Sequence, residues 1–315
     1  MGLTSNRAVR RSLKDSLPVA GGQAVRATAL TVLLLTAYPP NRLSAQGSGV
    51  ETLAVRLASM TAVTGLEQAM ADSLLALVPG SARDRAGNVT LTLGGGNAGG
   101  PKRLVACPLD EVGYVVGNLT DDGYLTLRRV GTRAAYPLFD QQLEGQPVTV
   151  FGAGGPVPGV VAVKSTHLTR GRPAGSDPVF TADNAYVDVG ATSRDEVRAL
   201  GIALLAPVAL TKRPHRYGDR LLAAPAAGRR AACAALVAAA RAKPSVKGTV
   251  VVAFTVQSLY ATNAGLGTVQ ALRGPFDETK QAALATRYTD TAVETVSLKD
   301  AEELERELVK WMEGR

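Results

Sequence analysis

Residues 107–111, Cys-Pro-Leu-Asp-Glu, are the first stretch whose residue types could carry chemistry. They follow an apolar run, where α/β enzymes commonly display catalytic side chains. The carboxylates of Asp110 and Glu111 could move protons or, together with Asp290, hold an oxygen-liking cation such as Ca²⁺ or Mg²⁺. A metal site would favour histidine two residues before the aspartate, but Pro108 offers no side-chain donor. Two interpretations stay open: an active centre, or a hydrogen-bonded turn left over from one.

Other candidate motifs are weaker. The chain contains no G-x-S-x-G elbow, P-loop or HExxH. Ser258 could be a nucleophile, with Asp110 or Glu111 as a conceivable base, but no serine-hydrolase signature accompanies it. The glycine cluster at 94–100 leads into a strand rather than a helix, so it offers no phosphate site. The glycines at 151–159 indicate a hairpin instead.

Histidine and cysteine are scarce. The two histidines, His167 and His215, have no ligand at metal spacing, and structural or surface roles are favoured for them. Cys107 and Cys233 fit neither a metal motif nor a CxxC redox motif. They could pair in an oxidising compartment, or each could be a small buried side chain.

Charge and composition exclude a nucleic-acid-binding protein. The formal net charge of the 315 residues is +8, from 35 basic and 27 acidic residues. Six of the basic residues but only one acidic residue fall within residues 1–45, so the remainder carries only +3. Aromatic residues make up 4%, too few for a base-stacking surface.

Residues 1–45 are predicted to be an export signal or an N-terminal anchor. Arginines precede the apolar run ATALTVLLLTAY at 27–38, which is too short to span a bilayer as a helix. Leu43-Ser44-Ala45 then resembles a small-residue cleavage site before Gln46. A disordered tail is the alternative. The localisation predicted from this segment is periplasmic, or at the periplasmic face of the inner membrane.

The elements around these residues indicate an α/β domain interrupted by a β-rich insert. Apolar spacing predicts helices, and short apolar runs predict strands. The helices are 50–60, 65–78, 229–242 and one starting at Ser297, and the strands are 87–94, 102–107 and 248–257. The last helix has Ser297 as N-cap with Asp300 three residues on. Its predicted apolar face is Leu298, Ala301, Leu304, Leu308 and Trp311. Residues 114–220 change to short strands separated by glycine and proline turns.

Several ordered motifs resemble the tetrahedral aminopeptidases, the FrvX-like or glutamyl-aminopeptidase-type di-metal peptidases. LDEVGYVVGNLTDDGYLTLRRVG resembles the family's MDEIGF…DGFL…PIGG, and YVDVGATSRDEVRALGI resembles DIGASSREEAEELGV. VPGVVAVKSTHL, FTVQ and TRYTDTAVE are similar to further family segments in the same order. The resemblance covers residues 50–315. It implies a truncated zinc-peptidase-like α/β/α domain, formed by 46–113 and 221–315. It also implies an inserted small β-barrel or PDZ-like dimerisation domain at 114–220.

The resemblance also implies a chemistry that uses two divalent metals to activate a water, with a separate glutamate as general base. Position by position, most of that set is replaced. Pro108 stands at the first histidine position and Ala227 at the bridging aspartate. Asp110 is retained, but in the family it orients the missing histidine.

The remaining positions are replaced as well. Ser258 stands at the general base, Leu259 at a metal-bound carboxylate and Asp290 at the terminal histidine. The segment between FTVQ and TRY is also several dozen residues shorter than the family pattern, so the edge of the domain must be rebuilt.

These replacements predict a protein that is not an enzyme, without cofactor or metal. The leading hypothesis is a catalytically inactive aminopeptidase homologue, exported as a structural or accessory subunit of a larger, membrane-associated assembly. Its partners would then be proteins, including copies of itself, and not nucleic acid. Two alternatives are a module that binds a peptide or small ligand in the former active-site cleft, and residual metallo-aminopeptidase activity.

Overall fold

The computed structural model describes residues 49–95, 99–131, 139–163, 180–260 and 263–315. The described residues all belong to one compact unit. The predicted export signal at 1–45, His167 and the middle of the glycine cluster at 94–100 lie outside the described residues. Among the described helices, none combines the length and apolar composition needed to cross a membrane.

A five-stranded sheet forms the centre of the α/β part. Its order is β1-β2-β12-β3-β13, with bounds Ala82–Arg83, Val89–Gly94, Thr249–Thr255, Lys102–Pro108 and Glu278–Gln281 respectively. β12 and β13 both run parallel to β3, whereas β2 runs antiparallel to β12. The carboxyl ends of β3 and β12 therefore meet at one edge, with Pro108 opposite Thr255.

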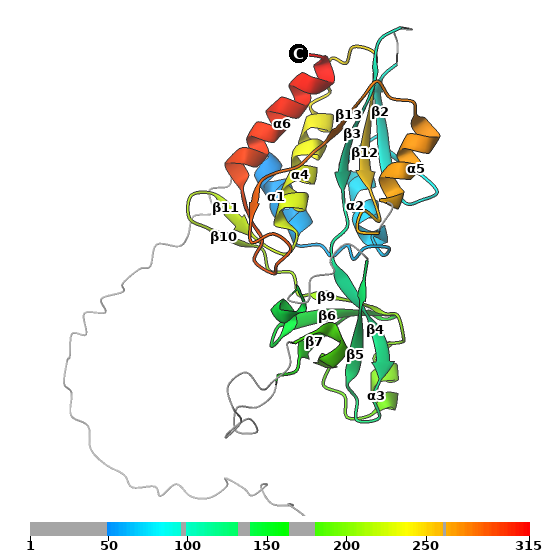
Figure 1. The fold of residues 1–315 in the computed structure, drawn as a ribbon, viewed down its shortest axis with the longest axis vertical. Helices are drawn as coiled ribbons and strands as arrows, with labels where there is room; N and C mark the ends of the chain where they lie inside the picture. The colour runs from blue at the N-terminus through cyan, green and yellow to red at the C-terminus, as the bar shows by residue number, and fades with distance from the viewer. Residues whose placement is uncertain (1–48, 96–98, 132–138, 164–179, 261–262) are drawn as a thin grey trace, which may run out of the picture. The chain divides into compact units, whose positions relative to one another are not determined.

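Helices cover both faces of this sheet (Figure 1). Successive residues of β12, such as Val251 and Val252, belong to the apolar cores of opposite faces, because neighbouring side chains along a strand point to opposite sides. One core includes residues of α1, α2, α4 and α6, and the other includes Val269 of α5. The bounds are Gly49–Ala58 for α1, Gln68–Leu77 for α2, Ala227–Arg241 for α4, Ala264–Arg273 for α5 and Leu298–Glu313 for α6.

The segment between β3 and α4 contains a closed six-stranded barrel. Its order is β4-β5-β8-β7-β6-β9, with bounds Gly113–Leu119, Leu125–Val130, Tyr186–Asp188, Gly155–Val161, Pro147–Gly152 and Pro207–Leu210 respectively. β6 and β7 form the expected hairpin, in which Gly152 pairs with Gly155. The short helices η1 (Phe139–Leu143), η3 (Ala182–Asn184) and α3 (Arg194–Ala199) connect these strands.

A second, four-stranded sheet has the order β10-β11-β15-β14. Its strands are His215–Tyr217, Leu221–Ala223, Thr295–Ser297 and Thr286–Arg287 respectively. The α/β fold with a small β-barrel is therefore confirmed, whereas the exact domain boundaries stay a prediction.

Helix α6 starts where the sequence predicts, at the Ser297 N-cap, whose Oγ accepts a hydrogen bond from the Asp300 N–H at 3.2 Å. Four residues of its predicted apolar face are buried, and Trp311 packs partly buried against the same core, to which Met312 adds a further buried side chain. Trp311 also stacks on the guanidinium of Arg103, 5.1 Å from the ring centre, and donates to Glu278.

Removing the α6 cap should destabilise the protein modestly. The substitution Ser297→Ala leaves the Asp300 N–H without its acceptor, and we expect a loss of about 1 kcal/mol of unfolding free energy. Urea denaturation followed by circular dichroism measures the effect. Ser245→Ala, at an exposed serine outside any helix, is the matched control and should change stability by less than half as much.

Candidate functional site

The candidate site lies at the carboxyl ends of the parallel strands β3 and β12. The chain leaves β3 into Asp110 and Glu111, and leaves β12 into Ser258 and Leu259. The Leu109 N–H donates to the Thr255 carbonyl at 2.7 Å, which extends the contact beyond the strands themselves. Carboxyl ends of parallel strands are where α/β folds commonly place ligands.

Asp110 is fully buried, and its side chain contacts Ser258, the backbone of Leu259 and Arg229. Ser258 Oγ donates to its Oδ1 at 2.6 Å, and the Leu259 N–H donates to its Oδ2 at 2.9 Å. Arg229 Nη1 lies 3.6 Å from Oδ1 and forms an ion pair. Asp110 is thus held in a turn in which its charge is compensated.

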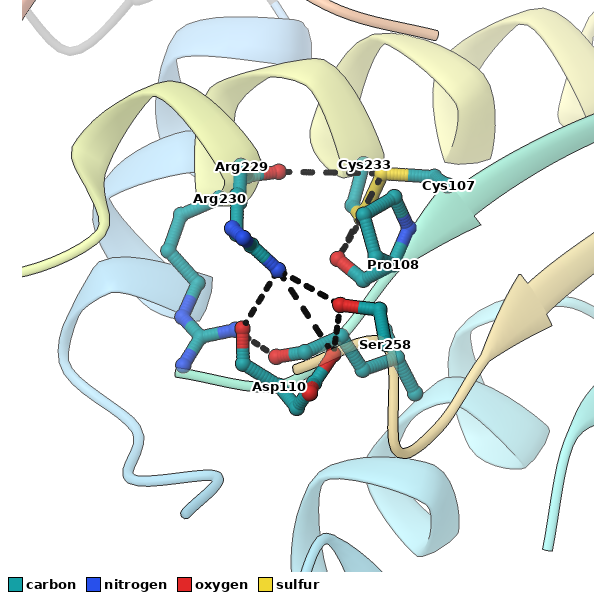
Figure 2. Close-up of a disulfide and its surroundings, with 8 residues drawn as sticks. Cys107, Pro108, Asp110, Arg229, Arg230, Cys233 and Ser258 are labelled. Atoms are coloured by element: carbon teal, nitrogen blue, oxygen red, sulfur yellow. Dashed lines mark hydrogen bonds and ion pairs between the residues drawn. A yellow bond between two sulfur atoms is a disulfide. The ribbon is translucent and has the colours of Figure 1, made fainter. Parts of the chain in front are cut away.

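Arg229 connects the two strand ends to helix α4 (Figure 2). Its Nη1 donates to Ser258 Oγ at 2.7 Å and to the Asp110 carbonyl at 3.2 Å. Arg229 and Arg230 lie in the first turn of α4, where the helix dipole disfavours positive charge. Two arginines at this position therefore need the neighbouring carboxylates to offset that cost.

A second buried charge cluster lies beside the first. Glu111 forms ion pairs with Lys212 at 2.5 Å and with Arg230 at 3.2 Å, and all three side chains are at least nine-tenths buried. Burial alone would raise the pKa of Glu111, but the two cations lower it. Burial lowers the pKa of Lys212, and Arg230 adds to this while Glu111 opposes it. The cluster carries two cations for one carboxylate.

Asp290 and Glu294 supply the acidic side of the site. Glu294 accepts hydrogen bonds from the Gly228 N–H at 2.8 Å and from the Asp290 N–H at 2.9 Å, so it caps the start of α4. Burial raises the pKa of Glu294, and the nearby Asp290 carboxylate adds to the rise. The two hydrogen bonds and the positive charge of Arg229 oppose it. The Asp290 residue itself is exposed.

Two cavities share Arg229, Asp290 and Glu294 in their walls. The larger has a volume of about 310 Å³ and is also lined by Pro108 and Ser258. The smaller has a volume of about 40 Å³ and is lined by residues of both the barrel and the α/β part. We call the larger one the strand-end cleft.

A disulfide fixes the strand end to the helix. Cys107, the penultimate residue of β3, is bonded to Cys233 of α4, with 5.5 Å between their Cα atoms (Figure 2). Both residues are buried. Of the two possibilities left open by the sequence, pairing is the one found.

The predicted site residues gather around this cleft. Pro108, Ser258 and Asp290 line the cleft, and Leu259 and Asp290 line the smaller cavity. Ala227 is buried as the first residue of α4, next to Gly228, which also lines the cleft. The roles assigned to these positions stay predictions. Asp110, Glu111 and Asp290 do not form a cation site among the described residues, because Lys212 and the arginines of α4 pair with the first two.

The family model of the M42 glutamyl aminopeptidases matches residues 87–258, which is more than half of the chain. The chain belongs to the M42 family. Among curated relatives, it is 31% identical over 185 residues to the Escherichia coli (strain K12) protein named "Putative aminopeptidase SgcX", covering 58% of this chain and 48% of that one. It is also 31% identical over 121 residues to the lysyl aminopeptidase of Pyrococcus furiosus, covering 38% and 32% respectively. The chain therefore spans about half the length of the first of these relatives and about a third of the length of the second.

Solved structures of M42-like aminopeptidases share the fold. The aminopeptidase APDkam598 of Desulfurococcus kamchatkensis superposes with a TM-score of 0.68 at 18% identity, covering 84% of this chain and 95% of that one. The TET1 peptidase of Pyrococcus horikoshii gives 0.68 at 19% identity, covering 84% and 99%. Such low identities establish the fold alone.

The prediction that the chain is not an enzyme is wrong. The matching family is one of aminopeptidases, and the curated relatives carry aminopeptidase names, so the comparisons point to a peptidase. The inactivity was inferred from the replaced family positions. Their side chains show which metal ligands are missing, but this does not determine whether the protein catalyses a reaction.

The two metals that the family resemblance implies do not fit the residues at the strand ends. Pro108, Ala227 and Leu259 carry no donor atoms in their side chains. The guanidinium of Arg229 lies 2.7 Å from Ser258 Oγ and brings positive charge to the place where a divalent cation would need ligands. No group of three or more His, Cys, Asp and Glu side chains suited to a metal gathers in the part of the chain that the structure describes. The charges of this cleft are those of the chain's own side chains.

Sequence reasoning did not single out three charged residues of this region: Arg229 and Glu294, which line the strand-end cleft, and Lys212, which pairs with Glu111. Glu294 is the last residue of the family-like segment TRYTDTAVE, but no role was predicted for it. One available signal was the pair of arginines at the start of an otherwise apolar, alanine-rich helix, where the helix dipole would favour acidic residues.

Proposed function

We propose that this M42-family chain acts on peptides by binding their amino end in the strand-end cleft. The observation that carries the proposal is a cavity whose wall holds two carboxylates and a guanidinium. No ion pair joins Arg229 to Asp290 or Glu294 among the described residues. An ammonium group beside the carboxylates would relieve the repulsion between them, and the carbonyl of the first residue could accept from Arg229. The aminopeptidase names of the relatives support the same class of ligand.

The binding can be tested with a pair of peptides. Isothermal titration calorimetry should detect Leu-Gly-Gly but give at least tenfold weaker binding for its N-acetyl form, because acetylation removes the ammonium. Asp290→Asn should weaken Leu-Gly-Gly binding similarly, and Glu303→Gln, on an exposed position of α6, should leave it unchanged. Equal affinities for the free and acetylated peptides would contradict the proposal.

The pH dependence of binding follows from the raised pKa of Glu294. A peptide ammonium favours the ionised carboxylate, so affinity should be high above that pKa and fall as pH drops through it. It should fall again near pH 8, where the peptide amine loses its proton. Calorimetry from pH 4 to 9 should therefore give a bell-shaped profile. In Glu294→Gln the acidic limb should become shallower, since Asp290 is then the remaining carboxylate of the cleft, and an unaltered acidic limb would exclude Glu294 as its source.

We also propose that the chain is exported to the periplasm. The Cys107–Cys233 disulfide supports this, because structural disulfides persist in oxidising compartments. The apolar run at 27–38, with arginines before it, supports export independently. Fractionation of cells expressing the full chain, followed by immunoblotting, tests the localisation. Recovery in the cytoplasmic fraction with reduced cysteines would contradict it.

Self-association through the barrel is a further proposal. Val160 and Tyr186 of the neighbouring strands β7 and β8 are each about half exposed, which leaves apolar surface on the barrel. TET1 of P. horikoshii is described as assembling into a tetrahedron or an octahedral shell. Light scattering coupled to gel filtration measures the mass, and a monomer at micromolar concentration would contradict the proposal. The membrane-associated assembly and the accessory role stay predictions.

A further inference from the structure

We propose that the strand-end cleft also takes a free α-amino acid, bound as a zwitterion, with its carboxylate on Arg229 and its ammonium beside Asp290 and Glu294. This deepens the proposed peptide binding and rests on it, because the acidic side of the cleft is shared. The additional element is Arg229 as a receptor for a carboxylate.

Part of the Arg229 guanidinium is available to a ligand as a hydrogen-bond donor. Its hydrogen bonds to described residues, Ser258 and the Asp110 carbonyl, are both made by Nη1, and Nη1 is also the atom nearest Asp110 Oδ1. Nε and Nη2 make no hydrogen bond to the described part of the chain, and the side chain is 29% exposed. The guanidinium is therefore fixed at one end and available at the other. A planar fork of this kind matches a carboxylate with two parallel hydrogen bonds.

The acidic side is equally available. The carboxylate of Asp290 makes no hydrogen bond or ion pair with the described residues, although both its backbone N–H and its carbonyl are used. Asp290 and Arg229 line the same cleft but lie more than an ion-pair distance apart within the described structure. Opposite charges that face one cavity without pairing leave room for a ligand that carries both signs.

The size and remaining walls of the cleft fit a small ligand. Its volume of about 310 Å³ is at the lower end of the range for small-molecule pockets. Pro108, Ala232, Ala282 and Leu284 give one part of it an apolar surface, and uncharged polar residues line the rest: Ser258, Asn263, Gln281, Thr286 and Thr289. Apart from Arg229, Asp290 and Glu294, the described residues that line it are uncharged. Leucine is the natural probe, since its side chain would lie on the apolar surface and its two charges on the polar one.

Three matched ligands test the inference on the full-length protein. Calorimetric titration should detect L-leucine, and should show at least tenfold weaker binding of L-leucinamide, which lacks the carboxylate, and of N-acetyl-L-leucine, which lacks the ammonium. Arg229→Met should weaken the binding of L-leucine at least tenfold. The variant should then bind L-leucine and L-leucinamide with equal affinity. Arg273→Met, at an exposed arginine of α5, should leave all three affinities unchanged.

A second variant covers the case in which Arg229→Met does not fold, since that substitution removes a partner of buried Asp110. Asp290→Asn changes an exposed side chain. It should weaken the binding of L-leucine without affecting the binding of N-acetyl-L-leucine. The inference is overturned if leucinamide binds as tightly as leucine, or if leucine does not bind while Leu-Gly-Gly does. In that last case the proposed peptide binding survives alone, whereas loss of both ligands overturns both proposals.

Discussion

Replacing Glu111 with glutamine is expected to lower the unfolding free energy by about 3–5 kcal/mol, because two buried cations lose the carboxylate that they share. Lys212 and Arg230 both pair with Glu111, and none of the three side chains is more than 7% exposed. The glutamine carbonyl can still accept from the Ala62 N–H, which donates to Glu111 at 3.0 Å. The loss of unfolding free energy would therefore measure the effect of removing the charge and not that of removing the hydrogen bond. Urea denaturation at pH 7, followed by circular dichroism, measures it.

Lys212→Met is the matched comparison for this experiment. It removes one of the two cations and leaves Glu111 paired with Arg230, so the cluster becomes neutral and the cost should be about 1 kcal/mol or less. If Lys212→Met lowers the unfolding free energy as much as Glu111→Gln does, the claim that the cluster carries an excess positive charge is contradicted.

The same cluster predicts how stability depends on pH. The pKa of Glu111 is lowered in the folded protein, so its contribution is present above the unfolded-state pKa and is lost as pH falls through the folded-state value. The unfolding free energy of the natural chain should therefore drop below about pH 4.5. Glu111→Gln should show a shallower drop over the same range.

The double substitution Cys107→Ala and Cys233→Ala is expected to cost about 4 kcal/mol. The disulfide closes a loop with a sequence separation of 126 residues, and cross-links across long loops restrict the unfolded chain most. The bond also fixes the end of β3 to α4, both of which carry site residues. Denaturation of the natural chain with and without a reductant should reproduce the difference, and the double variant should be insensitive to the reductant. Equal stability of the natural and double-variant proteins would show that the bond does not form.

Much of the fold could be predicted from periodicity because those elements have one unambiguous environment. The five central residues of β12, VVVAF, are all apolar, as is typical of a strand buried on both faces, and α6 has a capping serine and a clear apolar stripe. Strand β13 could not be found this way, because Glu-Thr-Lys-Gln is mostly exposed and is a strand only through its pairing with β3. It forms the edge of the sheet, in the segment that the resemblance marks as shortened.

The candidate site was predicted in its location but not in its chemistry. Pro108, Ser258 and Asp290 were placed by the family pattern and do lie at one cleft. The chemistry at these positions depends on Arg229 and Lys212, which place a guanidinium beside Ser258 and an ammonium beside Glu111. The sequence does not show which side chains these two cations contact. Such long-range pairing depends on tertiary contacts, in this case between residues 29 and 101 positions apart.

The central claim is that the chain's own arginine and carboxylates, and not a pair of divalent metals, form the ligand-binding charges of the cleft. Calorimetric titration of Leu-Gly-Gly into protein stripped with a chelator and dialysed against metal-free buffer tests it most directly. We predict the same affinity and stoichiometry as for untreated protein, with no change on adding Zn²⁺ or Co²⁺. Binding that disappears in the stripped protein and returns with two equivalents of either metal would contradict the claim.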